Sequence, residues 1–288
     1  MIENGLSIDV DDFVSAFSDS YNISGNMPQT HISEDVERVL QLLKRKNIRA
    51  TFFVNGKSIA HSPTIINKIH DLGHEIGCHG YSHKYIWQYK TQQEFEEDLE
   101  KCLELIYRQT GVKPSGYRSP GCTLTFNRHM VLNALEKFGF SYDSSLTTFG
   151  FSKQHKHTTG PAHPFKWEND IVEFPLSSTP FGPVRIPAFG SYFLRIFPAF
   201  LTHLAISKLN HHQHHAFLYF HGFELFRRKY PKDIMNIHFP FVRVYNLRSG
   251  ARFEAKLACI LQKHAFVPYG ELLPRFSQLP PEETLDSL

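Results

Sequence analysis

Three carboxylates lie within four consecutive positions near the start of the chain. The stretch LSIDVDDF, residues 6–13, holds Asp9, Asp11 and Asp12 at the end of an alternating, strand-like run. Asp9 and Asp11 are two positions apart, so on a regular strand their side chains point the same way. Like charges packed this closely repel one another. We therefore expect a positive charge beside these aspartates.

Two imidazoles that could hold a divalent metal ion follow later in the chain. His79 and His83 enclose the segment GYS, and on a tightly turned backbone both rings can face one point. Together with one carboxylate they form a three-ligand site that leaves one position open for water. A divalent ion is then the positive charge that the aspartates require. Zn²⁺ is the first candidate, and Co²⁺, Ni²⁺ and Fe²⁺ suit the same ligands.

Hydrolysis at such a centre also needs a base for the water proton and an acid for the leaving group. One aspartate can bind the metal while the other receives the proton. Arg118, in YRSPG, is a fixed cation that could hold the base carboxylate, although a plain surface salt bridge is the alternative. His221 ends the apolar run AFLYF and is the candidate acid. The histidine-rich HHQHH, at 211–215, is instead expected in an exposed polar loop.

The elements that must position these residues alternate between strand and helix through the first two-thirds of the chain. This alternation predicts parallel strands with helices outside them, and a barrel rather than an open sheet. Functional side chains of such a barrel lie at the carboxyl ends of its strands, where Asp143 also falls. Strands are expected at 6–13, 49–56, 74–83, 114–121 and 140–145, with helices at 33–47, 62–73, 91–111 and 127–139.

The alternation breaks at residues 146–215, which we expect to form an irregular insertion. The apolar stretch 189–210 is interrupted by Arg195 and His203, which favours a core or cleft-wall helix over a helix lying on a membrane surface. We expect one domain over 1–278. Further elements are expected as a strand at 171–178, a strand ending at His221, a helix at 251–266 and a mobile tail at 279–288.

Composition limits the class of protein. The 288 residues, with 41% hydrophobic content and a net charge of +3, are enough for a full core and show no basic stripe for nucleic acid. The four cysteines form no C-x-x-C pair, which is typical of reduced thiols. The sequence contains no run of about 18 apolar residues, the length that a membrane-spanning helix requires. The first strand begins before a signal peptide could fit, so we expect a cytoplasmic protein.

Six segments occur in a specific order: the Asp-rich strand, ATFFVNG, GHEIGCHGYSH, GYRSPG, FSYDSS and YFHGFEL. Together they resemble the NodB-homology polysaccharide deacetylases of carbohydrate esterase family 4. The resemblance covers about residues 5–275. It implies an α/β fold, a distorted (β/α) barrel of a single domain. It also implies hydrolysis of N-acetyl groups on sugars with Zn²⁺ or a related divalent ion.

The resemblance also implies roles for individual residues. Two departures from the family pattern are the spacing of the aspartates, Asp-Val-Asp-Asp in place of adjacent Asp-Asp, and Gly80, where many members have Ser or Thr. The implied metal ligands are His79, His83 and Asp11, with Asp12 a less favoured alternative to Asp11. The implied base is Asp9, braced by Arg118, and the implied acid is His221, whose pKa Asp143 would tune. Tyr117 and Arg195 are implied to lie near the substrate.

FGSYFLRIFP and YFHGFEL are similar to a narrower branch, the deacetylases of exopolysaccharide and lipopolysaccharide biosynthesis, although Gly222 and Phe223 replace the usual Pro and Trp. The implied partner is an N-acylated sugar, either nucleotide- or lipid-linked, and contact with a membrane surface stays open. The alternatives are an amidase for a small amide, as in allantoinase-like relatives, a formyl-sugar hydrolase, or a non-catalytic glycan-binding barrel. No oligomeric state follows from the sequence.

Overall fold

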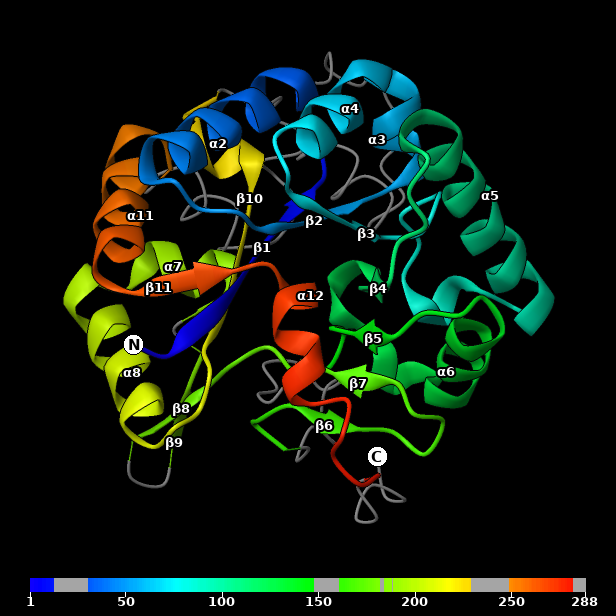
Figure 1. Cartoon of the computed structure of the whole chain (residues 1–288). Coiled ribbons are helices and arrows are strands. Elements are labelled where there is room, and N and C mark those ends of the chain that lie inside the picture. The colour runs from blue at the N-terminus through cyan, green and yellow to red at the C-terminus, as the bar shows by residue number, and fades with distance from the viewer. Residues whose placement is uncertain (13–30, 148–160, 182–183, 188, 229–248, 282–288) are drawn as a thin grey trace.

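A curled sheet of mainly parallel strands forms the centre of the molecule, with helices around its outside (Figure 1). The computed structural model describes residues 1–12, 31–147, 161–181, 184–187, 189–228 and 249–281. The strands follow the order β10-β1-β2-β3-β4-β5-β7-β6, and β11 pairs with β1. Among the described strands of this sheet, only β6 runs antiparallel to its neighbour. The predicted α/β barrel-like architecture is therefore confirmed.

The strands of this sheet are short and buried. Continuous apolar runs such as TFFV in β2 are typical of parallel strands covered on both faces. The strands are β1 (Glu3–Val10), β2 (Thr51–Val54), β3 (Glu75–Cys78), β4 (Gly116–Tyr117), β5 (Tyr142–Asp143), β6 (Phe165–Lys166), β7 (Val172–Glu173), β10 (Phe217–His221) and β11 (Ala265–Val267), with β8 (Thr179–Phe181) and β9 (Val184–Ile186) forming a separate hairpin.

The outer helices form because each has one apolar stripe that faces the sheet. In α2 the stripe includes Val36, Val39 and Leu43, all buried. Thr91 caps α5 by accepting from the backbone N–H of Glu94, and Gly111 ends that helix at a φ of 69°. The helices are α2 (Ile32–Lys46), α3 (Gly56–His61), α4 (Pro63–Asp71), α5 (Gln92–Thr110), α6 (Arg128–Lys137), α7 (Ser191–Ile196), α8 (Ala199–His211), α11 (Ala251–Lys263) and α12 (Tyr269–Leu272).

Several elements differ from the sequence prediction. The expected single helix at 189–210 is two helices, α7 and α8, because Pro198 has no N–H and Phe197 before it is extended. The helix α3 was missed, since Asn55 and Gly56 indicated a strand end, whereas the Asn55 side chain caps a helix by accepting from Ser58 N–H. The last predicted helix ends at Lys263 and gives way to β11.

Other predicted segments are described only in part. Of the expected insertion at 146–215, the structure describes β6 to β9, α7 and α8. Of the tail at 279–288, residues 282–288 lie outside the described residues. No described helix is both long enough and apolar enough to cross a membrane.

The strand register gathers the predicted site residues at one edge of the sheet. Asp9 of β1 lies opposite His221 of β10 on one side and Phe53 of β2 on the other. Arg118 directly follows β4, and its backbone N–H donates to the carbonyl of Cys78, which ends β3. The carboxyl ends of β1, β3, β4 and β10 thus meet, and the loops after them supply the site.

Candidate metal centre and active site

A carboxylate and two imidazoles meet at the carboxyl edge of the sheet. The Nε2 atom of His83 lies 3.1 Å from Oδ2 of Asp11, and Nε2 of His79 lies 3.7 Å from the same oxygen. All three residues are buried, and one ligand atom from each lies within 4.8 Å of the others. The structure therefore brings together the three residues that the sequence predicted as metal ligands. Asp12 is not part of this group.

The hydrogen bonds around this group suit a divalent cation. Nδ1 of His79 lies 2.6 Å from the carbonyl oxygen of Arg118, which can only accept, so the ring donates there and, in its neutral form, leaves Nε2 unprotonated. The lone pair of Nε2 then faces the Asp11 carboxylate, and a cation between them removes the repulsion. Asn55 donates to the other Asp11 oxygen at 2.9 Å. Such outer hydrogen bonds are typical of protein metal sites.

The loop that carries both histidines has an unusual backbone held by one acidic residue. Gly80 and His83 have φ of 72° and 57°, in the left-handed region. Asp98 of α5 accepts from the backbone N–H groups of Tyr81 at 2.7 Å and Ser82 at 3.1 Å. Asp98 thus fixes the turn that directs both rings to one point. Sequence reasoning missed Asp98, because it lies inside an acidic amphipathic helix with no local motif.

A buried arginine holds the second aspartate. Nη1 of Arg118 lies 2.7 Å from Oδ1 of Asp9, and the guanidinium also donates to Ser7, Ser144 and Tyr269. Burial opposes the charge of Arg118, but Asp9 together with Tyr269 and Cys122 outweighs burial and raises the Arg118 pKa. The guanidinium is therefore charged and rigid, and it orients Asp9.

His221 faces both aspartates from β10. Its Nε2 atom lies 3.9 Å from Oδ2 of Asp9 and 3.7 Å from Oδ2 of Asp11. Its Nδ1 atom lies 2.8 Å from Oε1 of Glu224, in the 3₁₀ turn η5 (Gly222–Leu225). Burial lowers the pKa of His221, but Glu224 and the two aspartates outweigh burial and raise it. The arrangement favours a ring that can deliver a proton from Nε2.

His221 is contacted by Glu224 and not by Asp143, the residue predicted to tune it. The structure does not bring Asp143 to His221: its Oδ1 accepts from Ser145 Oγ at 2.6 Å, and its carboxyl interacts with Glu173. Burial raises the pKa of Asp143 to about 6. A glutamate three residues after His221 could have been considered, because one 3₁₀ turn brings such residues together.

The two residues predicted to lie near the substrate are buried. Tyr117 is 1% exposed, and its ring packs against Phe95 and Phe140. Arg195 is 4% exposed, and its Nε lies 3.3 Å from Oε2 of Glu224. Both side chains are therefore largely shielded from a substrate, and their roles in substrate binding stay predictions. Arg195 is linked to the site through Glu224, which contacts His221.

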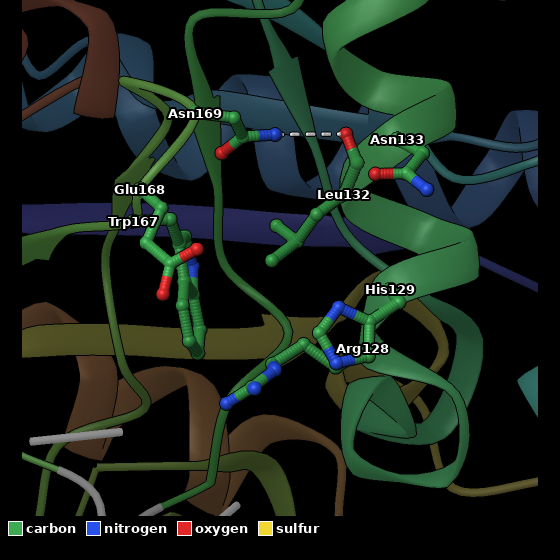
Figure 2. A pocket seen from close by; sticks show the side chains of 7 residues that line it. All are labelled: Arg128, His129, Leu132, Asn133, Trp167, Glu168 and Asn169. Carbon is green, nitrogen blue, oxygen red and sulfur yellow. Dashed lines mark hydrogen bonds between the residues drawn. The ribbon is translucent and has the colours of Figure 1, made fainter. Parts of the chain in front are cut away.

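A pocket elsewhere on the molecule is not part of this site. It lies between α6 and the turn that joins β6 and β7, and Figure 2 shows the side chains that line it. In it, Asn169 donates to the carbonyl of Leu132 at 3.0 Å, and the Arg128 guanidinium lies 5.5 Å from the Trp167 ring centre. None of the predicted catalytic or metal-binding residues lines this pocket.

Comparison with known proteins bears on this arrangement. The family described as Polysaccharide deacetylase matches residues 15–142. Residues 15–142 belong to the polysaccharide deacetylase family. The adjoining residues 144–274 match a Domain of unknown function (DUF3473). His79, His83 and Arg118 therefore lie in the deacetylase match, Asp9 and Asp11 precede it, and His221 lies in the second match.

Individual relatives share only part of their sequence with this chain. A peptidoglycan deacetylase from Helicobacter pylori is 39% identical over 111 residues, which are 38% of this chain and 36% of that protein. The match thus spans about a third of the relative's length.

Solved structures match over almost the whole chain. A Mycobacterium smegmatis protein named as a polysaccharide deacetylase covers 96% of this chain and 91% of its own, with a TM-score of 0.65 and 20% identity. One from Pseudomonas aeruginosa covers 97% and 92%, with a TM-score of 0.60 and 16% identity. At these identities the likeness concerns the fold, and it supports the (β/α) barrel.

Proposed function

We propose that this protein is a metal-dependent deacetylase that removes an N-acetyl group from a sugar or glycan. The observation that carries the proposal is the convergence of two buried groups at one sheet edge: the Asp11, His79 and His83 cluster, and Asp9 held by Arg118. The family of residues 15–142 supports the same chemistry.

The ligands proposed for the metal are Asp11, His79 and His83. A divalent ion bound there, with Zn²⁺ the first candidate, would polarise the amide carbonyl and lower the pKa of the attacking water. Hydrogen bonds from Asn55 to Asp11, and between His79 and the Arg118 carbonyl, hold two of the ligands in place before any ion arrives.

The proton transfers are assigned to Asp9 and His221. Asp9 receives the proton of the attacking water, because its Oδ1 is bound to Arg118 while its Oδ2 faces His221. His221 then delivers a proton from Nε2 to the departing amine, while Glu224 holds Nδ1 and keeps the ring oriented.

The substrate is proposed to be an N-acetylated glycan or its precursor in the synthesis of a cell-surface polysaccharide. The Helicobacter pylori relative, which is named a peptidoglycan deacetylase, supports this class of substrate. Nucleotide- or lipid-linked forms of the sugar, and the cytoplasmic location on which they depend, stay predictions.

Metal content measured by mass spectrometry, with acetate release measured in parallel, tests the proposal. We expect about one equivalent of metal in the wild type and none in the double variant His79→Ala/His83→Ala, because the site has three protein ligands. Asp9→Asn should keep its metal and lose about 10²- to 10⁴-fold in turnover, the usual share of a general base.

Two results would contradict the proposal. A wild type that stays metal-free after incubation with Zn²⁺ would remove the metal and the hydrolase with it. Full turnover in Asp9→Asn would remove Asp9 as the base but leave the metal site standing.

A further inference from the structure

A cysteine and two histidines form a row of hydrogen bonds between α8 and α11, two helices that lie side by side on the outside of the sheet (Figure 1). Sγ of Cys259 lies 3.5 Å from Nε2 of His203, and Nδ1 of His203 lies 3.0 Å from Nε2 of His264. Cys259 is partly exposed. We call these three residues the Cys-His-His row.

The protons of the Cys-His-His row follow from these contacts. The thiol of Cys259 donates to Nε2 of His203, so the neutral ring of His203 carries its proton on Nδ1 and donates it to Nε2 of His264. Burial, with the charges of Lys263 and Lys256, lowers the pKa of His203. Burial, with His203, lowers the pKa of His264. The neutral form of both rings therefore predominates at pH 7.

This order of groups is that of an activated nucleophile. His203 is a base within reach of the thiol proton, and His264 holds the ring of His203 by its other nitrogen. Lys256 and Lys263 lie three and four residues from Cys259 on α11, so all three share one face of the helix. The two positive charges stabilise the negative charge that develops on the sulfur during a reaction.

Metal binding is the other chemistry that cysteine and histidine side chains provide, and the geometry does not favour it. The contacts run in line, with the two ring nitrogens of His203 facing different partners. Among the described residues, the group of three side chains whose ligand atoms converge is Asp11, His79 and His83. The Cys-His-His row is therefore arranged for proton transfer rather than for coordination.

The Cys-His-His row is remote from the candidate active site. His264 directly precedes β11, in which Ala265 pairs with Glu3 at the amino end of β1. Asp9 lies six positions further along β1, which is about 20 Å at the usual rise of a strand. The proposed deacetylation does not use Cys259, so this nucleophile needs a separate explanation.

We propose that Cys259 is a reactive thiol that forms a mixed disulfide with a low-molecular-weight disulfide. The thiol passes its proton to Nε2 of His203, and Sγ attacks one sulfur of the disulfide. The new S–S bond forms as the old one breaks, and the departing thiolate takes the proton from His203. Cys259 is thereby oxidised, and the released half of the disulfide is reduced to a thiol. This inference goes beyond the proposed function and does not depend on it.

The experiment uses 5,5′-dithiobis(2-nitrobenzoate) as the probe, an aromatic disulfide whose released thiol is coloured. The chain has 4 Cys residues, of which Cys78, Cys102 and Cys122 are buried. We expect the thiol of Cys259 to react fast in the native protein, and the buried thiols to react only in urea. Peptide mass spectrometry should place the fast label on Cys259, and Cys259→Ser should lose the fast reaction.

His203→Gln tests the base. Glutamine keeps a hydrogen-bond acceptor but takes up no proton, so the fast rate should fall about 10²-fold, the lower end of the usual contribution of a general base. His264→Asn, which removes the partner of His203 Nδ1, should lose a smaller part of the rate. His211→Gln makes the same change at the exposed end of α8 and, as the matched control, should react like the wild type.

Free imidazole distinguishes lost proton transfer from changed access to the sulfur. His203→Ala leaves space beside Cys259, so added imidazole should restore part of its rate while leaving the wild-type rate unchanged. A variant that has lost its fold would differ, because its buried thiols would also react fast. His264→Asn then decides the question in place of the His203 variants.

Three results would overturn the inference. The first is a wild type without a fast thiol, and the second is a fast label on a cysteine other than Cys259. The third is an equal fast rate in the wild type and in folded His203→Gln or, where that variant does not fold, in His264→Asn. Each result leaves the proposed deacetylase standing, because none of these measurements uses acetate release or metal binding.

Discussion

At the scale of single residues, the site depends on side chains that hold the reacting groups as much as on those groups themselves. Arg118 uses its guanidinium N–H groups on Asp9, Ser7, Ser144 and Tyr269, so its position is fixed before a substrate arrives. Pre-organisation of this kind lowers the cost of bringing a base into place for the reaction.

The buried pair of Glu224 and Arg195 gives a prediction at this scale. The side chains are 0% and 2% exposed, with Arg195 Nε 3.3 Å from Glu224 Oε2. Glu224→Gln should lower the free energy of unfolding by about 3 kcal/mol, because a buried charge loses its partner. Urea unfolding measures this, and kcat should fall in the same variant because His221 loses its anionic partner.

A double variant provides the control for that prediction. Glu224→Gln/Arg195→Met removes both charges and should recover most of the lost stability, since an apolar replacement leaves no unpaired ion. Activity should stay low, because His221 still lacks Glu224. Equal stability of wild type and Glu224→Gln would show that Arg195 finds another partner.

At the scale of elements, the turn after β3 determines whether two histidines become ligands. His79 and His83 are four apart in the sequence, yet the left-handed residues Gly80 and His83 make the segment a turn rather than a helix. In this conformation the backbone N–H groups of Tyr81 and Ser82 donate to the Asp98 carboxylate. A helix several residues away therefore shapes the proposed metal site.

Asp98→Ala tests this dependence. We expect the variant to bind Zn²⁺ about 10- to 100-fold more weakly, as is usual when an outer partner of a metal site is lost. Competition with a chelating dye measures the affinity. Glu100→Ala, on the exposed side of the same helix, is the control and should bind as the wild type does. Unchanged affinity in Asp98→Ala would mean that the turn forms without its carboxylate.

At the scale of the whole molecule, a buried histidine makes stability depend on pH. His74, which precedes β3, accepts from the backbone N–H of Ala50 at its Nδ1 atom and packs against Phe52. Burial, helped by the nearby charge of Arg49, lowers its pKa from 6.5 to about 4. The folded state therefore favours the neutral ring.

The sign of this effect follows from the two pKa values. Above pH 6.5 the ring is neutral in both states, and the stabilisation is complete. As the pH falls from 6.5 to about 4, the unfolded chain takes up a proton that the folded chain does not. The free energy of unfolding should therefore fall by about 2 kcal/mol over that range.

Urea unfolding between these pH values measures the loss. His74→Asn keeps an acceptor for Ala50 but cannot be protonated, so its stability should fall less with pH than that of the wild type. His70→Asn, at an exposed position of α4, should retain the wild-type slope. A wild type and His74→Asn with the same slope would assign the acid sensitivity to other groups.

Much of the fold could be predicted because most of its helices and strands follow from local sequence patterns. The spacing of Val36, Val39 and Leu43 indicates a helix with one buried face, and TFFV indicates a buried strand. Short or interrupted elements could not be predicted in this way. The strands β6, β8 and β9 have only two or three residues, too few to show a period.

The sequence by itself determined which residue types could do the chemistry and at which strand ends they lie. The residues at or just after the predicted strand ends are Asp9, Asp11, His79, His83, Arg118 and His221, and the carboxyl ends of parallel strands meet at one edge of a sheet. This rule predicts that residues as distant in sequence as Asp9 and His221 lie together, and the register places them opposite one another.

Only the tertiary structure decided which side chains surround these groups. Glu224 rather than Asp143 contacts His221, because η5 turns back towards β10, while Asp143 points to Ser145 and Glu173. Arg195 reaches Glu224 from a separate helix. Contacts between distant segments depend on strand order, helix packing and loop conformation, and these are properties of the folded chain rather than of any local pattern.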